Sequence, residues 1–287
     1  MHRFAPALAL LLIFPLASGG VPEAVSSLRA QQGADGGWGS RPATDWVMIG
    51  LAAAGEDVSA WGVDDYLLTH PPDATSLLAW ERATLALACA GKDASSAALV
   101  VKLGFVGAQY GNPSALNDDA WAILSLRASG TPADDANLRS SATYLLAGEN
   151  AQGGWGWSVG GLPDPDDTGA ALMALAASEH PLRGPGVARG VAYLRGTQAA
   201  DGGWGISPGA PSNVLSTAWA TMGLLASGED PATWTSATGA TPITALAAMQ
   251  QADGSFAYTI SGSGPQGPVN AGTAIVPLLG KTYVCNA

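Results

Sequence analysis

Positive charge is scarce in this chain of 287 residues. Only 12 Lys and Arg stand against 23 Asp and Glu, which gives a formal net charge of −11. A nucleic-acid-binding surface needs many basic side chains to neutralise phosphates, so we expect no nucleic-acid partner. The same charge disfavours adhesion to anionic membranes.

Cysteine and histidine are also rare, with 2 Cys and 3 His. Their spacing matches no zinc site, and no nucleophilic triad can be assembled around a Ser elbow. We predict no cofactor, and no metal site from these residues. Cys89 and Cys285 either form one disulfide or remain free thiols, and the sequence leaves both alternatives open.

Long apolar runs are absent after the N-terminus. His2 and Arg3 give a basic start, an apolar stretch follows at 4–16, and small residues at 17–19 offer a cleavage site. The stretch is shorter than the roughly 20 residues of a membrane-spanning helix. We therefore predict a signal peptide over 1–19, with secretion or display at the cell surface and no membrane span after cleavage.

The remaining chain is rich in material for a core. Apolar residues make up 47% and charged residues 12%, which excludes disorder. The 38 Gly and 19 Pro indicate many short connections between elements. We expect one large domain over 20–287.

A repeated turn dominates this domain. Each copy combines a helix end, a Gln, a Gly pair or its remnant and an aromatic residue, spaced in the second half of the chain by about 50 residues. The predicted structural residues of these turns are Gln31 with Trp38, Gln152 with Trp155, Gln198 with Trp204, and Gln250 with Phe256. This period suits two helices and their loops.

The segments after the turns are rich in Ala, Leu and Met on nearly every side, as in helices buried between other elements. We predict inner helices near 44–54, 77–90, 117–129, 167–178, 214–227 and 268–279. More amphipathic outer helices are predicted near 22–31, 61–70, 95–106, 136–147, 186–196 and 241–250. Six helix pairs make an all-α (α/α)6 toroid, and we favour a closed ring over an open solenoid.

The Gln-x-x-x-Asp-Gly-Gly-Trp-Gly turns resemble the QW repeats of the terpenoid cyclase and prenyltransferase-repeat superfamily. The resemblance covers essentially all of the predicted mature chain and implies the (α/α)6 toroid, which cobalamin-carrier domains share. It also implies that the Gln and Trp residues of the turns are structural clasps. The repeat is specific for fold and not for function.

One motif carries sharper chemistry. The run from Asp164 to Thr168 reads Asp-Pro-Asp-Asp-Thr and is similar to the acid motif of class II terpene cyclases. That resemblance implies Asp166 as the proton donor, with Asp164 and Asp167 as the carboxylates that tune it. Carboxylates gathered in an apolar cavity cannot all ionise, so one of them keeps its proton.

The alternative is helix capping. Asp167 and Thr168 share a register with Asp118 and Asp119, which we expect to be N-cap residues. Three observations favour capping over catalysis. Familiar class II cyclases pair the toroid with a second helical domain, which does not fit in 287 residues. Secretion separates the protein from cellular prenyl substrates, and several Trp are already used in the turns.

The starts of the inner helices meet at one end of the ring. Asp118 and Asp119 would there join Trp46, Trp121 and Trp219 as ligand-binding residues of an acidic mouth. Such a mouth suits a small apolar, cation-bearing or sugar-like ligand, Ca²⁺, or another surface protein.

The leading hypothesis from the sequence is a secreted, non-catalytic toroid that binds a ligand or partner. A corrinoid is one candidate ligand, through the resemblance to cobalamin carriers. The alternatives are a class II terpene cyclase with Asp166 as general acid, and a structural subunit of a cell-surface assembly.

Overall fold

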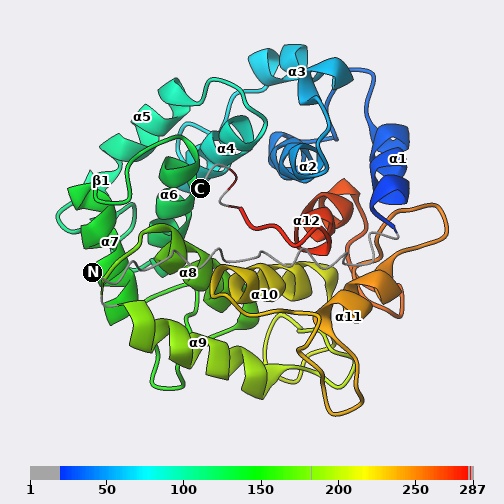
Figure 1. Cartoon of the computed structure of the whole chain (residues 1–287). Coiled ribbons are helices and arrows are strands. Elements are labelled where there is room, and N and C mark those ends of the chain that lie inside the picture. The colour runs from blue at the N-terminus through cyan, green and yellow to red at the C-terminus, as the bar shows by residue number, and fades with distance from the viewer. Residues whose placement is uncertain (1–19, 182, 284, 286–287) are drawn as a thin grey trace, which may run out of the picture.

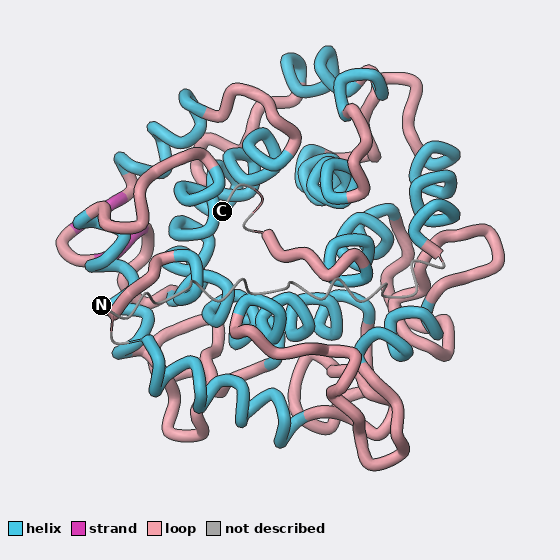
Figure 2. The backbone as a smooth tube through the Cα atoms, viewed as in Figure 1, coloured by secondary structure: helices cyan, strands magenta, loops and turns pink. Residues whose placement is uncertain are grey.

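The computed structural model describes residues 20–181, 183–283 and 285. The signal peptide predicted at 1–19 lies outside these residues. Within the described chain, helices form two concentric layers (Figure 1), and we call the space inside the inner layer, which buried side chains largely fill, the bore. Loops join the helices of the outer layer to those of the inner layer (Figure 2).

The inner layer contains alternate helices of the described chain. They are α2 (Arg41–Ala53), α4 (Leu77–Cys89), α6 (Leu116–Ala128), α8 (Pro165–Ala177), α10 (Val214–Ala226) and α12 (Pro268–Leu278). Each packs on the next in chain order, and α12 packs on α2. This last contact closes the ring and excludes the open solenoid.

The outer layer contains shorter or more exposed helices. They are α1 (Val21–Gln31), α3 (Val63–Thr69), α5 (Ser95–Leu103), α7 (Ala136–Ala147), α9 (Arg183–Thr197) and α11 (Pro242–Met249). A 3₁₀ turn, η1 (Val58–Trp61), precedes α3. The all-α prediction is therefore confirmed, with an alternation of outer and inner helices through the described residues.

Several predicted helices have different ends, two of them for clear local reasons. The helix expected over 95–106 stops at Leu103, because Phe105 and Val106 form strand β1 (Phe105–Val106), which pairs antiparallel with β2 (Gln109–Tyr110). The helix expected from 61 begins at Val63, because Gly62 adopts a φ of 74° between η1 and α3.

Glycine pairs let inner helices approach closely at two places. Gly169 of α8 faces Gly223 of α10, and Gly50 of α2 faces Gly272 of α12. A Cβ on Gly169 would overlap the carbonyl oxygen of Trp219, and one on Gly50 would overlap the backbone of Gly272. Small side chains at these crossings bring the helix backbones together and narrow the bore.

The aromatic residues of the turns tie outer helices to inner ones. The indole Nε1 atoms of Trp38, Trp155 and Trp204 donate to the carbonyls of Leu28, Leu145 and Leu194 at 2.8, 2.7 and 3.0 Å. Their backbone N–H groups donate to the hydroxyls of Thr44, Thr168 and Thr217 on inner helices, each at 3.0 Å. The Trp residues are therefore structural clasps.

The glutamine positions differ from the prediction in two copies. The clasp glutamine of the first turn is Gln32, whose Nε2 donates to the carbonyls of Gly36 and Trp61. Gln198 and Gln250, each six residues before its aromatic, likewise donate from Nε2 to two backbone carbonyls. Gln31 donates only within its own helix, and Gln152 is exposed. Both lie outside the register, which is set six residues before the aromatic.

The C-terminal tail crosses the bore after α12. Lys281 Nζ donates to the carbonyl of Ala53 at the end of α2, and Tyr283 is fully buried. Cys285 is joined by a disulfide to Cys89 at the end of α4, with 5.2 Å between their Cα atoms. The tail is thus fastened at the rim where the inner helices end.

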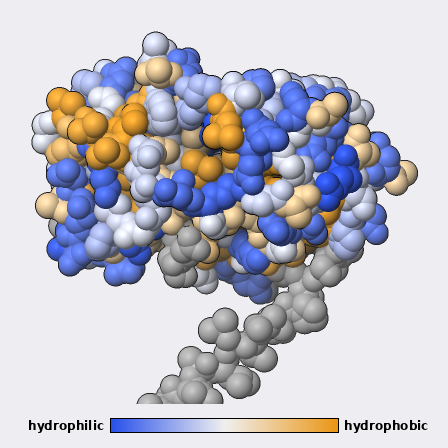
Figure 3. Space-filling view, turned by 90° about the horizontal axis from the view of Figure 1, so that it is seen from above, coloured by the Kyte–Doolittle hydropathy of each residue, from blue (hydrophilic) through white to orange (hydrophobic). Residues whose placement is uncertain are grey.

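The outer surface carries isolated apolar patches. Seen from the side of the ring that is at the top of Figure 1, hydrophilic side chains cover most of the face, and apolar side chains gather in places (Figure 3). Leu68 of α3 and Leu99 and Leu103 of α5 are among the exposed large apolar residues. In the described part of the chain, no helix is both long enough and apolar enough to span a membrane.

Candidate functional site

A cavity of about 410 Å³ opens at the end of the ring where the inner helices begin. It is lined by Trp46, Leu78, Arg82, Asn117, Trp121, Trp157, Asp164, Asp166, Asp167, Ile206 and Trp219. Its volume lies in the range of small-ligand sites. The three aspartates and the three inner-helix tryptophans singled out from the sequence therefore share one cavity.

The inner helices line the cavity from equivalent positions. Trp46, Trp121 and Trp219 are each six residues after the N-cap of α2, α6 or α10. Arg82 occupies that position in α4. One turn nearer the opening, Leu78, Asn117 and Asp166 are each two residues after the N-cap. This spacing places both sets on the side of each helix that faces the bore.

The three tryptophans close the inner end of the cavity. Trp46 lies 5.4 Å from Trp121 and 5.8 Å from Trp219 between ring centroids, and Trp121 lies 4.9 Å from Trp219. The side chain of Asn117 accepts a hydrogen bond from Trp121 Nε1 at 2.8 Å, which fixes that ring. The result is an aromatic floor below the acidic opening.

Asp164 is the N-cap of α8. Its carboxylate accepts the backbone N–H of Asp167 at 2.8 Å. The expectation that Asp167 and Thr168 cap this helix is therefore wrong. Thr168 instead binds the Trp155 backbone, and the caps of α2 and α10 are Ser40 and Asn213.

The Asp166 carboxyl is the one of the three with an unpaired oxygen among the described residues. Its Oδ1 atom is buried and has no hydrogen-bond partner among the described residues. Burial is the main cause that raises the pKa of Asp166, with a further rise from Asp164 and a lowering by the Ser216 hydroxyl, to about 7. This carboxyl therefore holds a proton at neutral pH in a substantial part of the molecules.

Asp167 holds its proton more firmly. Burial, then the charge of Asp164 and a hydrogen bond to it, raise the pKa of Asp167 to about 9. The higher pKa belongs to a proton shared with a neighbouring carboxylate. Asp166, by contrast, has a pKa near neutral and an unpaired oxygen, which suits a group that must give its proton away.

The other two predicted acids do not line the cavity. Asp118 accepts the backbone N–H of Asn112 at 2.9 Å. Asp119 is fully buried and accepts from the Tyr110 backbone at 2.9 Å and from the Ser141 hydroxyl at 2.5 Å. Asp119 replaces the threonine of the other clasps, so both residues support the turn before α6. The acidic residues of the predicted mouth that line the cavity therefore all belong to the start of α8.

The sequence reasoning missed five lining residues, which are Leu78, Arg82, Asn117, Trp157 and Ile206. Leu78 and Arg82 lie in the repeat whose start lacks the threonine, and Asn117 was considered only as a helix start. Aligning α4 with its siblings from Ser76 would have placed Arg82 at the tryptophan position. Arg82 Nε donates to Asp45 at 3.3 Å, and Arg41 Nε donates to the same carboxylate at 2.7 Å.

Glu81 is a further buried carboxyl that lies away from the cavity lining. It is fully buried, and neither of its oxygens has a hydrogen-bond partner among the described residues. Burial and, after it, the charges of Asp118 and Asp119 raise the pKa of Glu81 well above its ordinary range. In the described chain, no group of three or more His, Cys, Asp or Glu is placed to hold a metal ion.

No protein-family model matches this chain. No curated protein matches it either. Solved structures do. The type II terpene cyclase MstE from Scytonema superposes with a TM-score of 0.65 at 16% identity, over 93% of this chain and 98% of that one.

Two further structures have the same fold over less of their length. The ent-copalyl diphosphate synthase from Streptomyces platensis gives a TM-score of 0.57 at 21% identity, over 86% of this chain and 50% of its own. Candida albicans protein geranylgeranyltransferase-I gives 0.53 at 17% identity, over 70% and 66%. The chain therefore has the fold shared by type II terpene cyclases and protein prenyltransferases.

Proposed function

We propose that this protein is a type II, protonation-initiated terpene cyclase in which Asp166 is the general acid. The observation that carries the proposal is the Asp166 carboxyl, which lines an apolar cavity with a pKa of about 7 and an unpaired oxygen. An acid whose pKa lies near the working pH is well matched to proton transfer.

The reaction begins when Asp166 gives its proton to the terminal alkene or epoxide of a prenyl chain. With an alkene, a C–H bond forms as the π bond breaks; with an epoxide, an O–H bond forms and a ring C–O bond breaks; either way positive charge develops on carbon. Ring closure then consumes each alkene in turn, and loss of a proton to water ends the cascade. Asp166 recovers its proton from solvent through the opening beside Trp157 and Ile206, which are 56% and 64% exposed.

The aromatic floor supplies the second requirement. A cation over the face of a tryptophan is stabilised by about 0.5–2 kcal/mol, with the larger values in desolvated sites. Trp46, Trp121 and Trp219 all line the cavity below the acid. Since Trp38, Trp155 and Trp204 make the clasps, the aromatic wall draws on different residues from the structural turns.

The comparisons remove one argument against an enzyme. The matched region accounts for 98% of the MstE chain, so a second helical domain is not a general requirement for a type II cyclase. Other structures of that protein hold a geranylgeranyl dihydroxybenzoate substrate and a merosterolic acid product. A prenyl chain is accordingly the substrate class we propose here, in place of a sugar-like ligand or a partner protein.

We also propose that the protein works outside the cytoplasm. The Cys89–Cys285 disulfide supports this location, because such bonds persist in oxidising compartments. The N-terminal sequence features support it independently.

The test is product formation. Purified protein is incubated with geranylgeranyl diphosphate, squalene and geranylgeranyl dihydroxybenzoate, and extracts are analysed by mass spectrometry and NMR. Wild type should release a cyclised isomer from at least one of them. Asp166→Asn should lower the rate about 10³-fold, the usual contribution of a general acid.

Asp118→Asn is the matched control, since Asp118 begins a neighbouring inner helix without lining the cavity. Its rate should stay within a few-fold of wild type. The proposal fails if folded wild type forms no cyclised product from any of the three substrates. It also fails if Asp166→Asn is as active as Asp118→Asn.

A further inference from the structure

The bore of the ring holds two cavities rather than one. The acid-lined cavity of about 410 Å³ opens where the inner helices begin. A second cavity of about 390 Å³ opens where they end, lined by residues of α2, α4 and α10 and by the tail residues Lys281, Thr282 and Cys285. The two cavities share no lining residue, and inner-helix side chains such as Ile49 and Met222, one turn beyond the tryptophans, are buried in the core.

Four aromatic rings pack together at the inner end of the acid-lined cavity. Three are the tryptophans of the cavity floor, and the fourth is Tyr283 of the C-terminal tail. Tyr283 lies 5.6 Å from Trp46 and 5.9 Å from Trp121 between ring centroids. We call Trp46, Trp121, Trp219 and Tyr283 the aromatic septum.

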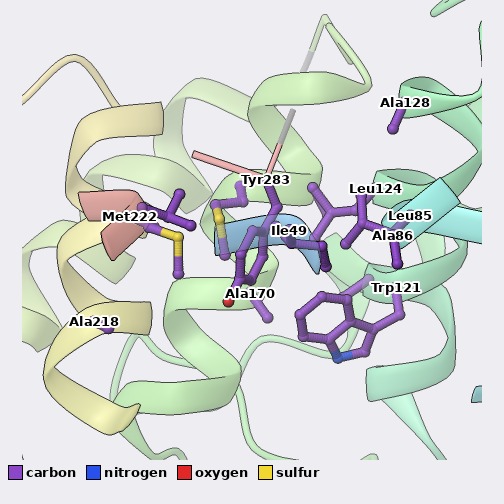
Figure 4. Close-up of a cluster of buried hydrophobic side chains, with 14 of the residues drawn as sticks. Ile49, Leu85, Ala86, Trp121, Leu124, Ala128, Ala170, Ala218, Met222 and Tyr283 are labelled. Carbon is purple, nitrogen blue, oxygen red and sulfur yellow. The ribbon is translucent and has the colours of Figure 1, made fainter. Parts of the chain in front are cut away.

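Tyr283 is the one member of the septum that no ring helix carries. Its ring projects into the buried apolar cluster that includes Ile49 and Met222 (Figure 4). The tail holds it there by the Lys281–Ala53 hydrogen bond on one side and the Cys89–Cys285 disulfide on the other. Its position therefore depends on these two tail anchors as well as on packing against the inner helices.

We propose that Tyr283 is a specificity-determining residue, which limits the length of prenyl chain that the acid cavity accepts. This inference rests on the proposed function and extends it to substrate length. With Tyr283 in place, a chain whose head lies at Asp166 meets the septum. Without it, Trp46 and Trp121 lose the buried ring that packs behind them, and the space that this ring filled deepens the acid cavity.

The expected effect follows from buried apolar surface. Each methylene that enters a dry site tightens Kd roughly fourfold. A chain longer than the cavity leaves its last methylenes in water or binds in a bent form, and gains little from them. Opening the septum should therefore favour longer chains selectively.

The test measures binding of geraniol, farnesol and geranylgeraniol by quenching of tryptophan fluorescence. Tyr283→Ala should raise the affinity for geranylgeraniol relative to geraniol by about tenfold or more over wild type. Tyr283→Phe is the matched control, because it keeps the ring and should keep the wild-type length preference. Circular dichroism verifies that each variant is folded.

Cys285→Ser provides a second route to the same result. It leaves Tyr283 intact and removes its covalent anchor, so the length preference should shift in the same direction by a smaller factor. It decides the matter if Tyr283→Ala does not fold. The inference is overturned if a folded Tyr283→Ala, or in its absence Cys285→Ser, retains the wild-type order and spacing of affinities.

Binding does not require turnover, so the two proposals can fail separately. A shift in length preference without cyclised product would support the role of Tyr283 and contradict the proposed cyclase activity. Cyclised product without a length shift would do the opposite.

Discussion

At the scale of single residues, aspartates within one helical turn differ in what holds their protons. The Asp164 carboxylate accepts the backbone N–H of Asp167, and the Asp167 carboxyl shares a proton with Asp164. Asp166, between them, keeps an oxygen that no described residue binds. The proline at 165 begins the helix without needing a hydrogen-bond donor, so the acid motif and the start of α8 are compatible.

Glu81 gives a prediction about pH and stability. Its pKa is raised in the folded protein, so the native state binds a proton that the unfolded chain releases. The free energy of unfolding therefore falls as pH rises above the unfolded value, by up to about 1.4 kcal/mol per pH unit for one proton. Glu81→Gln should match wild type near pH 4 and be more stable at pH 8.

Urea denaturation at both pH values measures this difference. The low-pH comparison serves as the internal control, since both side chains are neutral there. Equal stability of the two proteins at pH 8 would show that the Glu81 carboxyl is not carried as a buried acid.

Much of the site could be read from residue types. The three aspartates stood out because Asp164 and Asp166 are absent from the sibling repeats, and the tryptophans recurred in register. Arg82 and Asn117 could not be recognised by type, because their role comes from a position counted from an N-cap. Gln31 was chosen over Gln32 since two glutamines stand side by side, and only the carbonyls of Gly36 and Trp61 distinguish them.

At the scale of helices, the glycine pairs control how tightly the inner layer closes. Gly169 and Gly223 sit at the crossing of α8 and α10, directly beside the backbone of Trp219. The cavity acid and one tryptophan of the floor therefore belong to two helices held together by residues without side chains.

Gly169→Ala should destabilise the protein by about 1–3 kcal/mol, because its Cβ would push α10 away. Gly196→Ala is the matched control in exposed helix α9, where a Cβ meets nothing within 4 Å. That change should raise stability by up to about 1 kcal/mol. Chemical denaturation of both variants measures the contrast, and a neutral Gly169→Ala would argue against close packing at this crossing.

Helix order could be predicted well and helix ends less well. The all-round apolar segments identified the inner layer, because both of their faces are buried. Helix starts were placed up to three residues late, at 44 where α2 begins at Arg41, because Thr44 looked like a cap. The structure shows that this threonine binds the clasp tryptophan instead.

At the scale of the whole molecule, closure is both non-covalent and covalent. The contact of α12 with α2 completes the ring, and the Cys89–Cys285 disulfide links positions 196 residues apart across its end. Neither pairing could be derived from the repeats, since an open stack has the same period and two cysteines fit either state. Tyr283 follows the last helix without any pattern, so its burial in the bore was not predicted.

The aromatic septum has a consequence for how substrate would enter and product would leave the cavity. In the enzyme we propose, a cavity closed at its inner end by the aromatic septum would let substrate enter and product leave only through the one opening beside Trp157 and Ile206. Product would have to leave before the next substrate binds, and we expect an apolar cyclised product to leave an apolar cavity slowly. Added product should therefore inhibit initial rates competitively with substrate, and a non-competitive pattern would indicate a separate exit. The enzyme we propose would thus depend on a lipid phase or a carrier outside the opening that takes up the product, so that turnover continues.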